Sequence, residues 1–424
     1  MKPSVTARSA SRVIGANDRI NVASIGVGGM GGSHLRALVK QSEAKKDIQL
    51  VAVSDVYKLR KEKARETARL TAKDVHHDYL ELLARNDVDA VFIAVPDHWH
   101  GQIALDALAA GKDVYLQKPM TYTIEEARLV AEATTKYNRV LQVGSQHLST
   151  PHNRKARELV EAGEIGQVIW AQGTSSRNST NGEWNYYHVD PEGSPETIDW
   201  ARWLGTAPKR PFNADRYFRW RKYWDYSGGI ATDLFYHTLG PLAFITGAEF
   251  PTSVTAAGGI YMQKDREVPD SYASQIEYPN LYISLAGTML NAAGGKFHGS
   301  TIYGHNGTIW FSPGKVTVSK EVLIGSSLAK KPPAPPDKVY EVEDPADAHG
   351  AHTDNFFSCM RTRKTPNFPA DLGYRVMVAI RLGVDAYREG KTKFFDPKTQ
   401  RVIERQPPRP TYEGDGKNFP SSTE

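Results

Sequence analysis

Three side chains in this 424-residue sequence could move a proton: Lys118, Asp233 and His237. Lys118 lies in the segment Gln117-Lys118-Pro119, right after the strand-like run 113–116. A lysine there could hydrogen-bond a substrate hydroxyl and stabilise the oxyanion left when hydride departs. Asp233 and His237 lie four residues apart after the glycine pair 228–229, which predicts that they share one helix face. An imidazole beside a carboxylate suits proton transfer near neutral pH. The alternatives are a solvated surface lysine and a structural His–Asp pair.

A glycine-rich segment lies between an apolar run and a helical pattern. It spans residues 26–31 with the spacing G-x-G-x-x-G, and it contains Gly26, Gly28, Gly29, Met30 and Gly31. Such glycines allow a tight turn and let backbone amides approach a pyrophosphate, whose charge the following helix N-terminus stabilises.

Asp55 ends the next apolar run, at the spacing expected of a carboxylate that binds a ribose hydroxyl. A carboxylate at this place repels a 2′-phosphate, so the sequence favours NAD, while Lys58 and Arg60 just beyond it leave NADP open. The alternative role of Asp55 is a helix N-cap.

Strand-like runs alternate with helical patterns through the first third of the chain. The runs are 19–25, 48–54, 90–95, 113–116 and 140–143. This alternation predicts a parallel sheet with right-handed crossovers, and the continuous apolar runs fit a sheet covered on both faces. We therefore expect an α/β chain whose residues 19–147 form a doubly wound, Rossmann-type domain for a dinucleotide.

The composition and the pattern of the sequence change after residue 147. Six tryptophans fall between residues 170 and 224, and alternating runs follow at 253–258, 272–277, 281–289, 300–303 and 308–311. We expect an α+β domain over 148–403, with a large, mostly antiparallel open sheet and helices within 352–388. The stretch 330–337, KKPPAPPD, is predicted to be an exposed loop. Residues 1–18 are expected to form a flexible arm and residues 404–424 an extended tail.

Composition argues against several classes of protein. The net charge of +5 is spread along the chain, so no nucleic-acid partner is expected. A single cysteine, Cys359, allows no internal disulfide. No apolar run reaches about 18 residues, so we expect no membrane helix. Four histidines show no regular metal-ligand spacing, and no metal site is predicted: His76, His77, His147 and His152.

Taken together and in this order, these features resemble the Gfo/Idh/MocA family, named for glucose-fructose oxidoreductase and inositol dehydrogenase. The resemblance rests on the glycine segment 26–31, V-P-D-H-W-H at 95–100, K-P at 118–119, the G-G…D…H pattern at 228–237 and the C-terminal helices. It covers nearly the whole chain after residue 19. It implies an oxidoreductase that uses tightly bound NAD(P) and acts on a sugar or polyol.

The resemblance also implies roles for single residues. Lys118 resembles the lysine of an E-K-P motif, which usually precedes a cis proline and reaches the substrate hydroxyl. Asp233 and His237 resemble the substrate-binding acid and the general base. Pro96, Asp97, His100 and Gln117 complete the expected cofactor set, with Asp97 and His100 in the loop that passes the nicotinamide ribose. The C-terminal helices are expected to pack back on the nucleotide domain, and the exposed sheet to form a homodimer or homotetramer interface.

One position departs from the family motif, because Gln117 stands where the glutamate of E-K-P is expected. The change removes an ion partner of Lys118, so we predict a lower lysine pKa than in an E-K-P relative.

Four residues are expected to line the substrate side of the cleft: Arg221, Trp224, Tyr226 and Tyr236. Aromatic faces near carboxylates suit sugar rings, and the alternative for the aromatic residues is an ordinary core position.

Three functions compete. The first is hydride transfer between NAD(P) and a secondary hydroxyl of a sugar or polyol, with Lys118 and His237 in acid–base roles. The second is a glycoside hydrolase that works by transient C3 oxidation, elimination and re-reduction with bound, recycled NAD. The third, a non-catalytic dinucleotide-binding regulator, conflicts with the presence of all three candidate catalytic residues.

The first 18 residues contain no apolar core of a signal peptide. Many relatives with such a stretch carry a twin-arginine leader before it, so we expect either a periplasmic protein whose leader has been removed or a cytoplasmic one.

Overall fold

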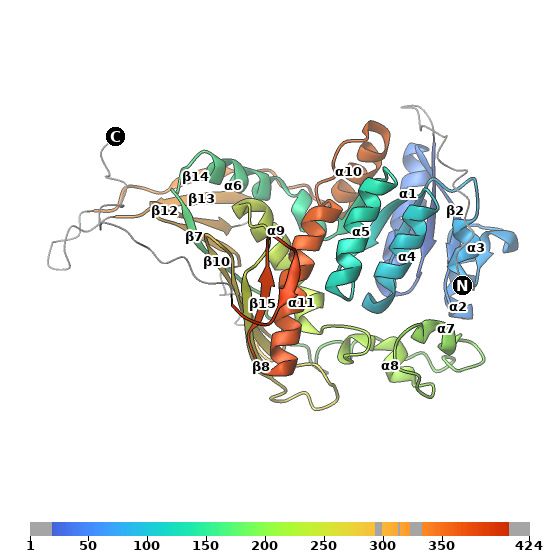
Figure 1. The fold of residues 1–424 in the computed structure, drawn as a ribbon. Helices are drawn as coiled ribbons and strands as arrows, with labels where there is room; N and C mark the ends of the chain where they lie inside the picture. The colour runs from blue at the N-terminus through green and yellow to red at the C-terminus, as the bar shows by residue number, and fades with distance from the viewer. Residues whose placement is uncertain (1–18, 293–298, 313, 323–332, 407–424) are drawn as a thin grey trace.

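The computed structural model describes residues 19–292, 299–312, 314–322 and 333–406 (Figure 1). Two sheets, each with helices packed on it, make up this part of the chain. The predictions for the arm 1–18, for residues 330–332 of the loop and for residues 407–424 of the tail lie outside the described residues. Residues 333–337 of the predicted loop are exposed and have no regular secondary structure, as expected.

The N-terminal sheet is parallel, with the strand order β3-β2-β1-β4-β5-β6. Its strands are β1 (Ile20–Ile25), β2 (Ile48–Ser54), β3 (Val75–His76), β4 (Ala90–Ile93), β5 (Asp113–Gln117) and β6 (Leu141–Gly144). Its helices are α1 (Gly29–Lys45), α2 (Lys58–Thr67), α3 (Tyr79–Leu83), α4 (Asp97–Ala109) and α5 (Ile124–Lys136). The predicted α/β class and Rossmann-type sheet are confirmed. The strand order reverses between β1 and β4, and such a switch point is where ligands bind in this architecture.

The second sheet has ten strands in the order β14-β13-β12-β11-β7-β10-β9-β8-β15-β16. They are β7 (Val168–Thr174), β8 (Ser253–Gly259), β9 (Ser271–Glu277), β10 (Tyr282–Thr288), β11 (Thr301–Gly304), β12 (Gly307–Ser312), β13 (Lys315–Lys320), β14 (Lys338–Glu341), β15 (Lys393–Asp396) and β16 (Arg401–Ile403). Neighbours pair antiparallel except β7 and β10, which are parallel. The expected mostly antiparallel sheet is confirmed, but its central strand β7 and the outer strands β13, β14, β15 and β16 were not anticipated from the sequence.

Helices α6 (Pro151–Glu161), α9 (Tyr236–Thr246) and α11 (Ala370–Glu389) pack against this second sheet or against each other. The approach of α9 to β7 is close, because a Cβ at Gly173 would lie 2.2 Å from a methyl group of Thr238. Glycine is therefore the residue that lets this helix reach the sheet.

The C-terminal helices connect the two halves. Helix α10 (Ala348–Thr362) buries Phe356 and Phe357 against Phe92 of the N-terminal sheet. Helix α11 packs on α5 and also on β8. These contacts agree with the expectation that the C-terminal helices pack back on the nucleotide domain.

A long connection between β7 and α9, residues 175–230, lies along the N-terminal half, and we call it the connecting segment. It contains the short helices α7 (Trp200–Leu204) and α8 (Ala214–Phe218), which lie near α2 and α4 in Figure 1. Its own aromatic core includes Trp203, Tyr217 and Phe218, and Tyr57 of the N-terminal half packs into that core.

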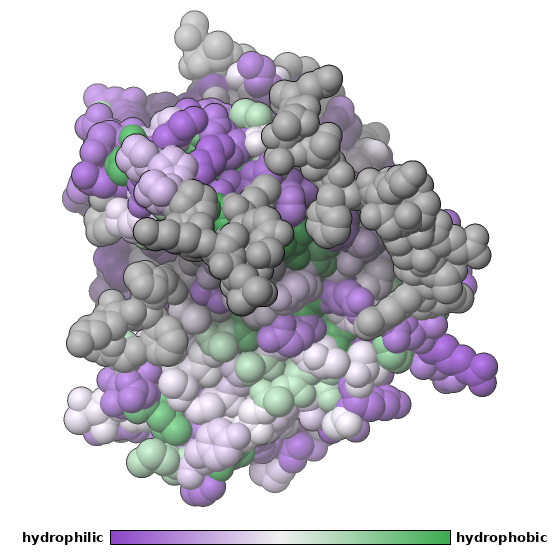
Figure 2. All heavy atoms as spheres, turned by 90° about the vertical axis from the view of Figure 1, so that its left-hand side faces the viewer, coloured by the Kyte–Doolittle hydropathy of each residue, from purple (hydrophilic) through white to green (hydrophobic). Residues whose placement is uncertain are grey.

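One face of the second sheet carries aromatic rings. Trp170 stacks on Tyr303 and Tyr282, with ring centroids 4.2 and 5.8 Å apart, and Tyr282 is 45% exposed. Figure 2, which views the molecule from the side of this sheet, shows pale and green residues between purple ones. Within the described residues, no helix is both long enough and apolar enough to span a membrane.

Candidate active site

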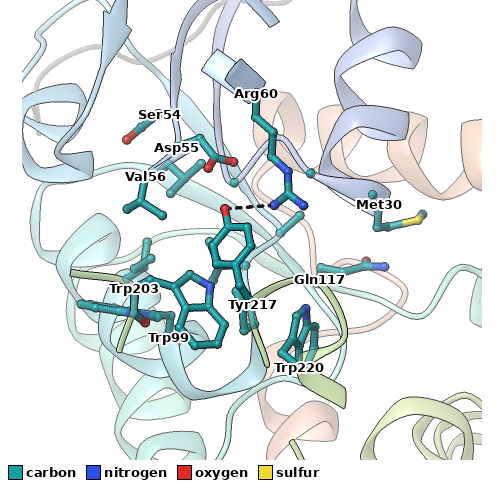
Figure 3. A pocket seen from close by; sticks show the side chains of 18 of the residues that line it. Met30, Ser54, Asp55, Val56, Arg60, Trp99, Gln117, Trp203, Tyr217 and Trp220 are labelled. Carbon is teal, nitrogen blue, oxygen red and sulfur yellow. Dashed lines mark hydrogen bonds between the residues drawn. The ribbon is translucent and has the colours of Figure 1, made fainter. Parts of the chain in front are cut away.

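A cleft at the carboxyl edge of the N-terminal sheet is lined by both halves of the chain. Gly28, Asp55 and Lys118 line it from the N-terminal half, and Tyr187 and Trp203 line it from the connecting segment. Figure 3 shows side chains of the two halves facing each other across this space. The parallel strands bring residues far apart in sequence to this one edge.

The glycine segment fits a bound pyrophosphate. Gly26 has φ +79°, and a Cβ there would lie 2.5 Å from the carbonyl oxygen of Ala94. A Cβ at Gly31 would lie 1.9 Å from the carbonyl oxygen of Gly26, so larger residues are excluded at both positions. Gly28 is the N-cap residue of α1, and no side chain bonds the first amides of the helix there. Gly28, Gly29 and Met30 line the cleft. The first-turn amides of α1 are thus placed to hold an anion.

Asp55 lines the same cleft and is held by two backbone amides. Its Oδ2 accepts a hydrogen bond from the N–H of Val27, and its Oδ1 accepts one from the N–H of Tyr57, both at 2.9 Å. The N-cap of α2 is Tyr57, so the alternative role of Asp55 as an N-cap is wrong. The hydrogen bond from Val27 holds the Asp55 carboxylate next to the glycine segment. This position agrees with the predicted role of Asp55 in binding the ribose of a dinucleotide.

Arg60 also lies in the cleft, pointing toward Tyr217 in Figure 3. Its guanidinium is 5.1 Å from the ring centroid of Tyr217 and 5.4 Å from that of Phe218, and its Nη1 donates to the Tyr217 hydroxyl at 3.3 Å. A Cβ at Gly28 would lie 2.8 Å from this guanidinium. Arg60 therefore bridges the phosphate-binding segment and the connecting segment.

Lys118 follows β5 and precedes a cis peptide bond to Pro119, as the resemblance implied. Its ammonium donates to Asp233 Oδ1 at 2.7 Å and to the Asp233 main-chain oxygen at 2.5 Å. The side chain is only 8% exposed, so the alternative of a solvated surface lysine is wrong. Burial lowers the pKa of the Lys118 ammonium, although the Asp233 carboxylate opposes this effect.

Asp233 joins three donors. Its Oδ1 also accepts from Arg221 Nε at 2.8 Å, and its Oδ2 accepts from the indole N–H of Trp184 at 3.0 Å. Burial by itself would raise the pKa of this carboxyl, but Lys118 and Arg221 outweigh burial and hold the pKa well below its usual value. Asp233 is therefore a buried anion that binds a lysine and an arginine.

The backbone around Asp233 is not a regular α-helix. Residues Ala231–Phe235 form a π-helical turn that precedes α9, whereas the sequence predicted an α-helical face shared with His237. The wider turn changes the helical register, and such turns are frequent at functional sites.

His237 has Ser145 as its partner, at 2.9 Å from Nδ1. Burial, followed by the charge of Lys118, lowers the pKa of His237 well below its usual value. The imidazole is thus neutral at pH 7. When Nδ1–H donates to the Ser145 hydroxyl, Nε2 carries the lone pair and is able to accept a proton.

The residues that follow β4 lie in the cleft or are buried next to it. Pro96 lines the cleft, whereas Asp97 and His100 are buried at the start of α4. Burial raises the pKa of Asp97 to about 7, with Arg221 and Lys118 opposing. His100 donates from Nδ1 to the carbonyl oxygen of Pro119, and burial lowers its pKa to about 4. Gln117, also buried, lines the cleft beside Lys118.

Of the four predicted substrate residues, Arg221 lines the cleft. Trp224 instead packs against Tyr387 and Arg388 of α11. Tyr226 and Tyr236 are completely buried, and the Tyr236 hydroxyl donates to the carbonyl oxygen of Gly373. These three aromatic residues occupy the alternative, core position, because neighbouring elements cover their rings.

Sequence reasoning missed the aromatic residues of the connecting segment that do line the cleft: Tyr187, Trp203, Tyr217, Phe218 and Trp220. The density of tryptophans in this region was visible, but it did not separate core rings from lining rings. Trp184 was missed as well, and its left-handed backbone (φ 65°) has no local sequence signal. In the described part of the chain, no cluster of three His, Cys, Asp or Glu residues could hold a metal ion.

Comparisons with known proteins agree with this fold. Residues 20–145 match a family model described as an oxidoreductase family with an NAD-binding Rossmann fold, and residues 157–393 match the C-terminal alpha/beta domain of the same family. Inositol 2-dehydrogenase of Salmonella typhimurium is 30% identical over 181 residues, which are 42% of this chain and 53% of that protein. The scyllo-inositol 2-dehydrogenase (NAD(+)) of Bacillus subtilis is 32% identical over 156 residues, which are 37% and 44%. The chain thus spans about half the length of the curated relatives that it matches.

Solved structures share the fold over nearly their whole length. A levoglucosan dehydrogenase in complex with NADH has a TM-score of 0.66 and 18% identity, covering 88% of this chain and 98% of that one. The aldose-aldose oxidoreductase of Caulobacter crescentus has a TM-score of 0.63 and 20% identity, covering 89% and 100%. With both family domains matched in order, the chain belongs to the Gfo/Idh/MocA oxidoreductase family and carries its NAD-binding Rossmann fold.

Proposed function

We propose that this protein oxidises a secondary hydroxyl of a sugar or polyol, or reduces the corresponding ketone. The observation that carries the proposal is the ion pair between Lys118, at the end of β5 in the NAD-binding domain, and Asp233 of the second domain. Lys118 thus supports the proposal as a buried cation that lines the cleft. His237, whose imidazole is neutral, lies on α9, the helix that follows Asp233.

When bound, NAD⁺ supplies the hydride acceptor. The side chains of this protein act on the oxygen of the substrate hydroxyl and on its proton. His237 accepts the hydroxyl proton at Nε2, since Nδ1 bonds Ser145. The Lys118 ammonium stabilises the oxygen as negative charge develops on it. Asp233 holds Lys118 and Arg221 in place, because its carboxylate oxygens already accept bonds from protein donors.

Lining residues support a polar substrate with a ring. Arg221 lies over the rings of Trp220 and Tyr187, with its guanidinium 4.2 and 5.2 Å from their centroids. Aromatic rings beside charged donors suit polyhydroxylated rings. Relatives named inositol 2-dehydrogenase and a fold neighbour named levoglucosan dehydrogenase make inositols and sugars the first substrates to test.

The test is a spectrophotometric screen at the NADH absorbance near 340 nm, with inositols, free sugars and aryl glycosides. We expect net NADH from a free sugar or inositol, and its loss in Lys118→Ala and His237→Ala but not in Lys45→Ala, which changes an exposed lysine on α1. Release of the aryl group without net NADH would instead identify the glycoside hydrolase. No turnover of any substrate by a protein that binds NAD would contradict both enzymes.

We also propose that the aromatic face of the second sheet, with Trp170, Tyr282 and Tyr303, forms a homodimer or homotetramer interface. Stacked rings on a flat, partly exposed sheet face offer a self-complementary apolar surface. Light scattering after gel filtration checks this proposal: the native chain should be oligomeric and Trp170→Glu should be smaller. A monomeric native protein would contradict it.

A further inference from the structure

Arg177 lies at the start of the connecting segment, where the chain continues the path of β7. The N–H of Ser175 donates to the Ala286 oxygen at 3.2 Å, and the N–H of Arg177 donates to the Thr288 oxygen at 3.0 Å. These bonds recur every second residue, as in a strand, although the segment is no longer part of β7. Residues 173, 175 and 177 therefore face the same side of the second sheet.

This side of the sheet carries helix α9 and the turn before it. A Cβ at Gly173 would lie 2.2 Å from a methyl group of Thr238, the residue directly after His237. On the neighbouring strand β10, a Cβ at Gly287 would lie 3.0 Å from the ring of Phe235, which ends the π-helical turn. The residues that follow β7 therefore run beside the turn that precedes the candidate base.

Arg177 is electrostatically coupled to the candidate catalytic residues. Burial lowers the pKa of the Arg177 guanidinium, but the carboxylates of Glu183 and Asp233 outweigh burial and raise it. Burial is the main cause of the low pKa of His237, and the positive charge of Arg177 lowers this pKa further. A cation on the second sheet thus acts on both the acid and the base of the proposed reaction.

Glu183 holds Arg177 in place without occupying the whole guanidinium. Nη1 of Arg177 donates to Oε1 of Glu183 at 3.0 Å, and the Glu183 side chain is completely buried. The Arg177 side chain is 49% exposed, and its guanidinium has no other protein acceptor in the described part of the chain. A guanidinium that is fixed at one nitrogen and open at the others can bind a planar anion through two parallel hydrogen bonds.

The charged groups around the candidate base offer donors rather than free acceptors. Each of the two carboxylates already accepts hydrogen bonds from three side chains: Lys118, Arg221 and Trp184 for Asp233, and Arg177, Ser179 and Tyr186 for Glu183. A substrate carboxylate supplies the acceptors that these donors can use. A hydroxyl of a neutral sugar brings a donor as well, and that donor then needs an acceptor of its own.

We propose that the substrate is a sugar acid and that Arg177 binds its carboxylate. The inference rests on the proposed function, because it names the class of hydroxyl compound that is oxidised there. Arg177 is then a substrate-binding residue and takes no part in the proton transfer. A carboxylate fits better than a phosphate, because Glu183 and Asp233 repel an anion in proportion to its charge and a phosphate monoester carries about −1.5 to −2.

The experiment compares each acid with its own neutral counterpart at constant ionic strength. The pairs are glucuronate with glucose, galacturonate with galactose and gluconate with sorbitol, and glucose 6-phosphate is the phosphate arm. Net NADH formation by the full chain gives kcat/KM, and calorimetric titration of the protein with NADH present gives the affinity without turnover. We expect kcat/KM about tenfold or more higher for at least one acid than for its neutral counterpart, as for hydrogen bonds to a charged group.

Two variants of Arg177 separate its charge from its shape. Arg177→Gln removes the cation and should raise KM for the acid about tenfold or more, with a much smaller rise for the neutral counterpart. Arg177→Lys keeps the charge but loses the two parallel bonds, so its KM for the acid should lie between those of the other two proteins. Arg65→Gln, which removes an exposed pair with Glu62 on α2, is the matched control and should leave the ratio of acid to neutral turnover unchanged. Circular dichroism confirms that each variant is folded.

The outcomes separate this inference from the proposed function. Oxidation of neutral sugars or inositols without a preference for any acid would overturn the inference and leave the proposed function intact. A preference for glucose 6-phosphate over glucuronate would overturn the choice of a carboxylate. An equal rise of KM for acid and neutral compound in Arg177→Gln would show a purely structural role of Arg177. Neither turnover nor binding of any compound would contradict the inference and the proposed function together.

Discussion

Replacing Asp233 with asparagine removes the carboxylate that pairs directly with Lys118 and Arg221 in a buried cluster, at 2.7 and 2.8 Å. The side chain keeps its size, so the change is chiefly electrostatic. Because Asp233 opposes the effect of burial on Lys118, its loss lowers the pKa of the lysine further. The NH₂ group of the asparagine is itself a donor, and it replaces a carboxylate oxygen that accepted hydrogen bonds from protein donors.

Removing one partner of a buried ion pair costs about 3–5 kcal/mol. If the 424 residues unfold together, about 2.1 cal/mol/K of unfolding entropy per residue converts this loss to a melting temperature lower by about 3–6 °C. The folded pKa of Asp233 is depressed, so its contribution is present above the usual carboxyl pKa and disappears only as pH falls through the lowered value. The deficit of Asp233→Asn should therefore persist from pH 8 to 5 and shrink only in strong acid.

Differential scanning calorimetry of Asp233→Asn beside the native chain gives the measurement, with net NADH formation followed in parallel. The matched control is Asp371→Asn, whose partner Arg375 forms an exposed i,i+4 pair worth about 0–1 kcal/mol. If Asp233→Asn melts at the same temperature as Asp371→Asn, the reasoning is refuted. Undiminished turnover by Asp233→Asn would refute it as well.

Three further substitutions test the site. Gln117→Glu adds a carboxylate beside Lys118 and should raise its pKa, seen as an upward shift of the lysine titration in NMR of the ¹³C-methylated protein; an unshifted titration would contradict the prediction. Asp55→Ser removes the charge that repels a 2′-phosphate, so the ratio of kcat/KM for NADP⁺ over NAD⁺ should rise about tenfold or more, and an unchanged ratio would exclude this role. Trp184→Phe deletes the indole donor to Asp233 and should lower stability to urea by about 1–3 kcal/mol, whereas native stability would show that this bond contributes nothing.

The N-terminal half was readable from the sequence because its signals are local. Apolar runs alternating with helical periodicity predicted β1, β2, β4, β5 and β6, and the glycine spacing predicted the turn into α1. β3 has only two residues and gives no such run. In the second sheet, β7 was missed even though it lies at the centre, because its sequence VIWAQGT begins with four apolar residues and does not alternate.

The candidate site was partly readable. Lys118 and Asp55 could be singled out because strand ends place them at the carboxyl edge of the sheet. Asp233 could be singled out because it precedes His237 by four residues after a glycine pair. The roles of Tyr226 and Tyr236 could not, because an aromatic residue reads the same whether it lines a cleft or fills a core. Only packing separated them from Tyr187 and Tyr217, which line the cleft.

The sequence alone determined the Rossmann domain, the glycine-rich turn into α1 and the candidate proton-moving residues, because strand period, helix period and turn chemistry act over a few neighbouring residues. The tertiary structure decided which partners those residues have. Lys118 reaches Asp233 across 115 positions and Trp184 reaches it across 49, while the connecting segment docks beside Asp55. Such contacts depend on how whole elements pack, and no local pattern encodes them.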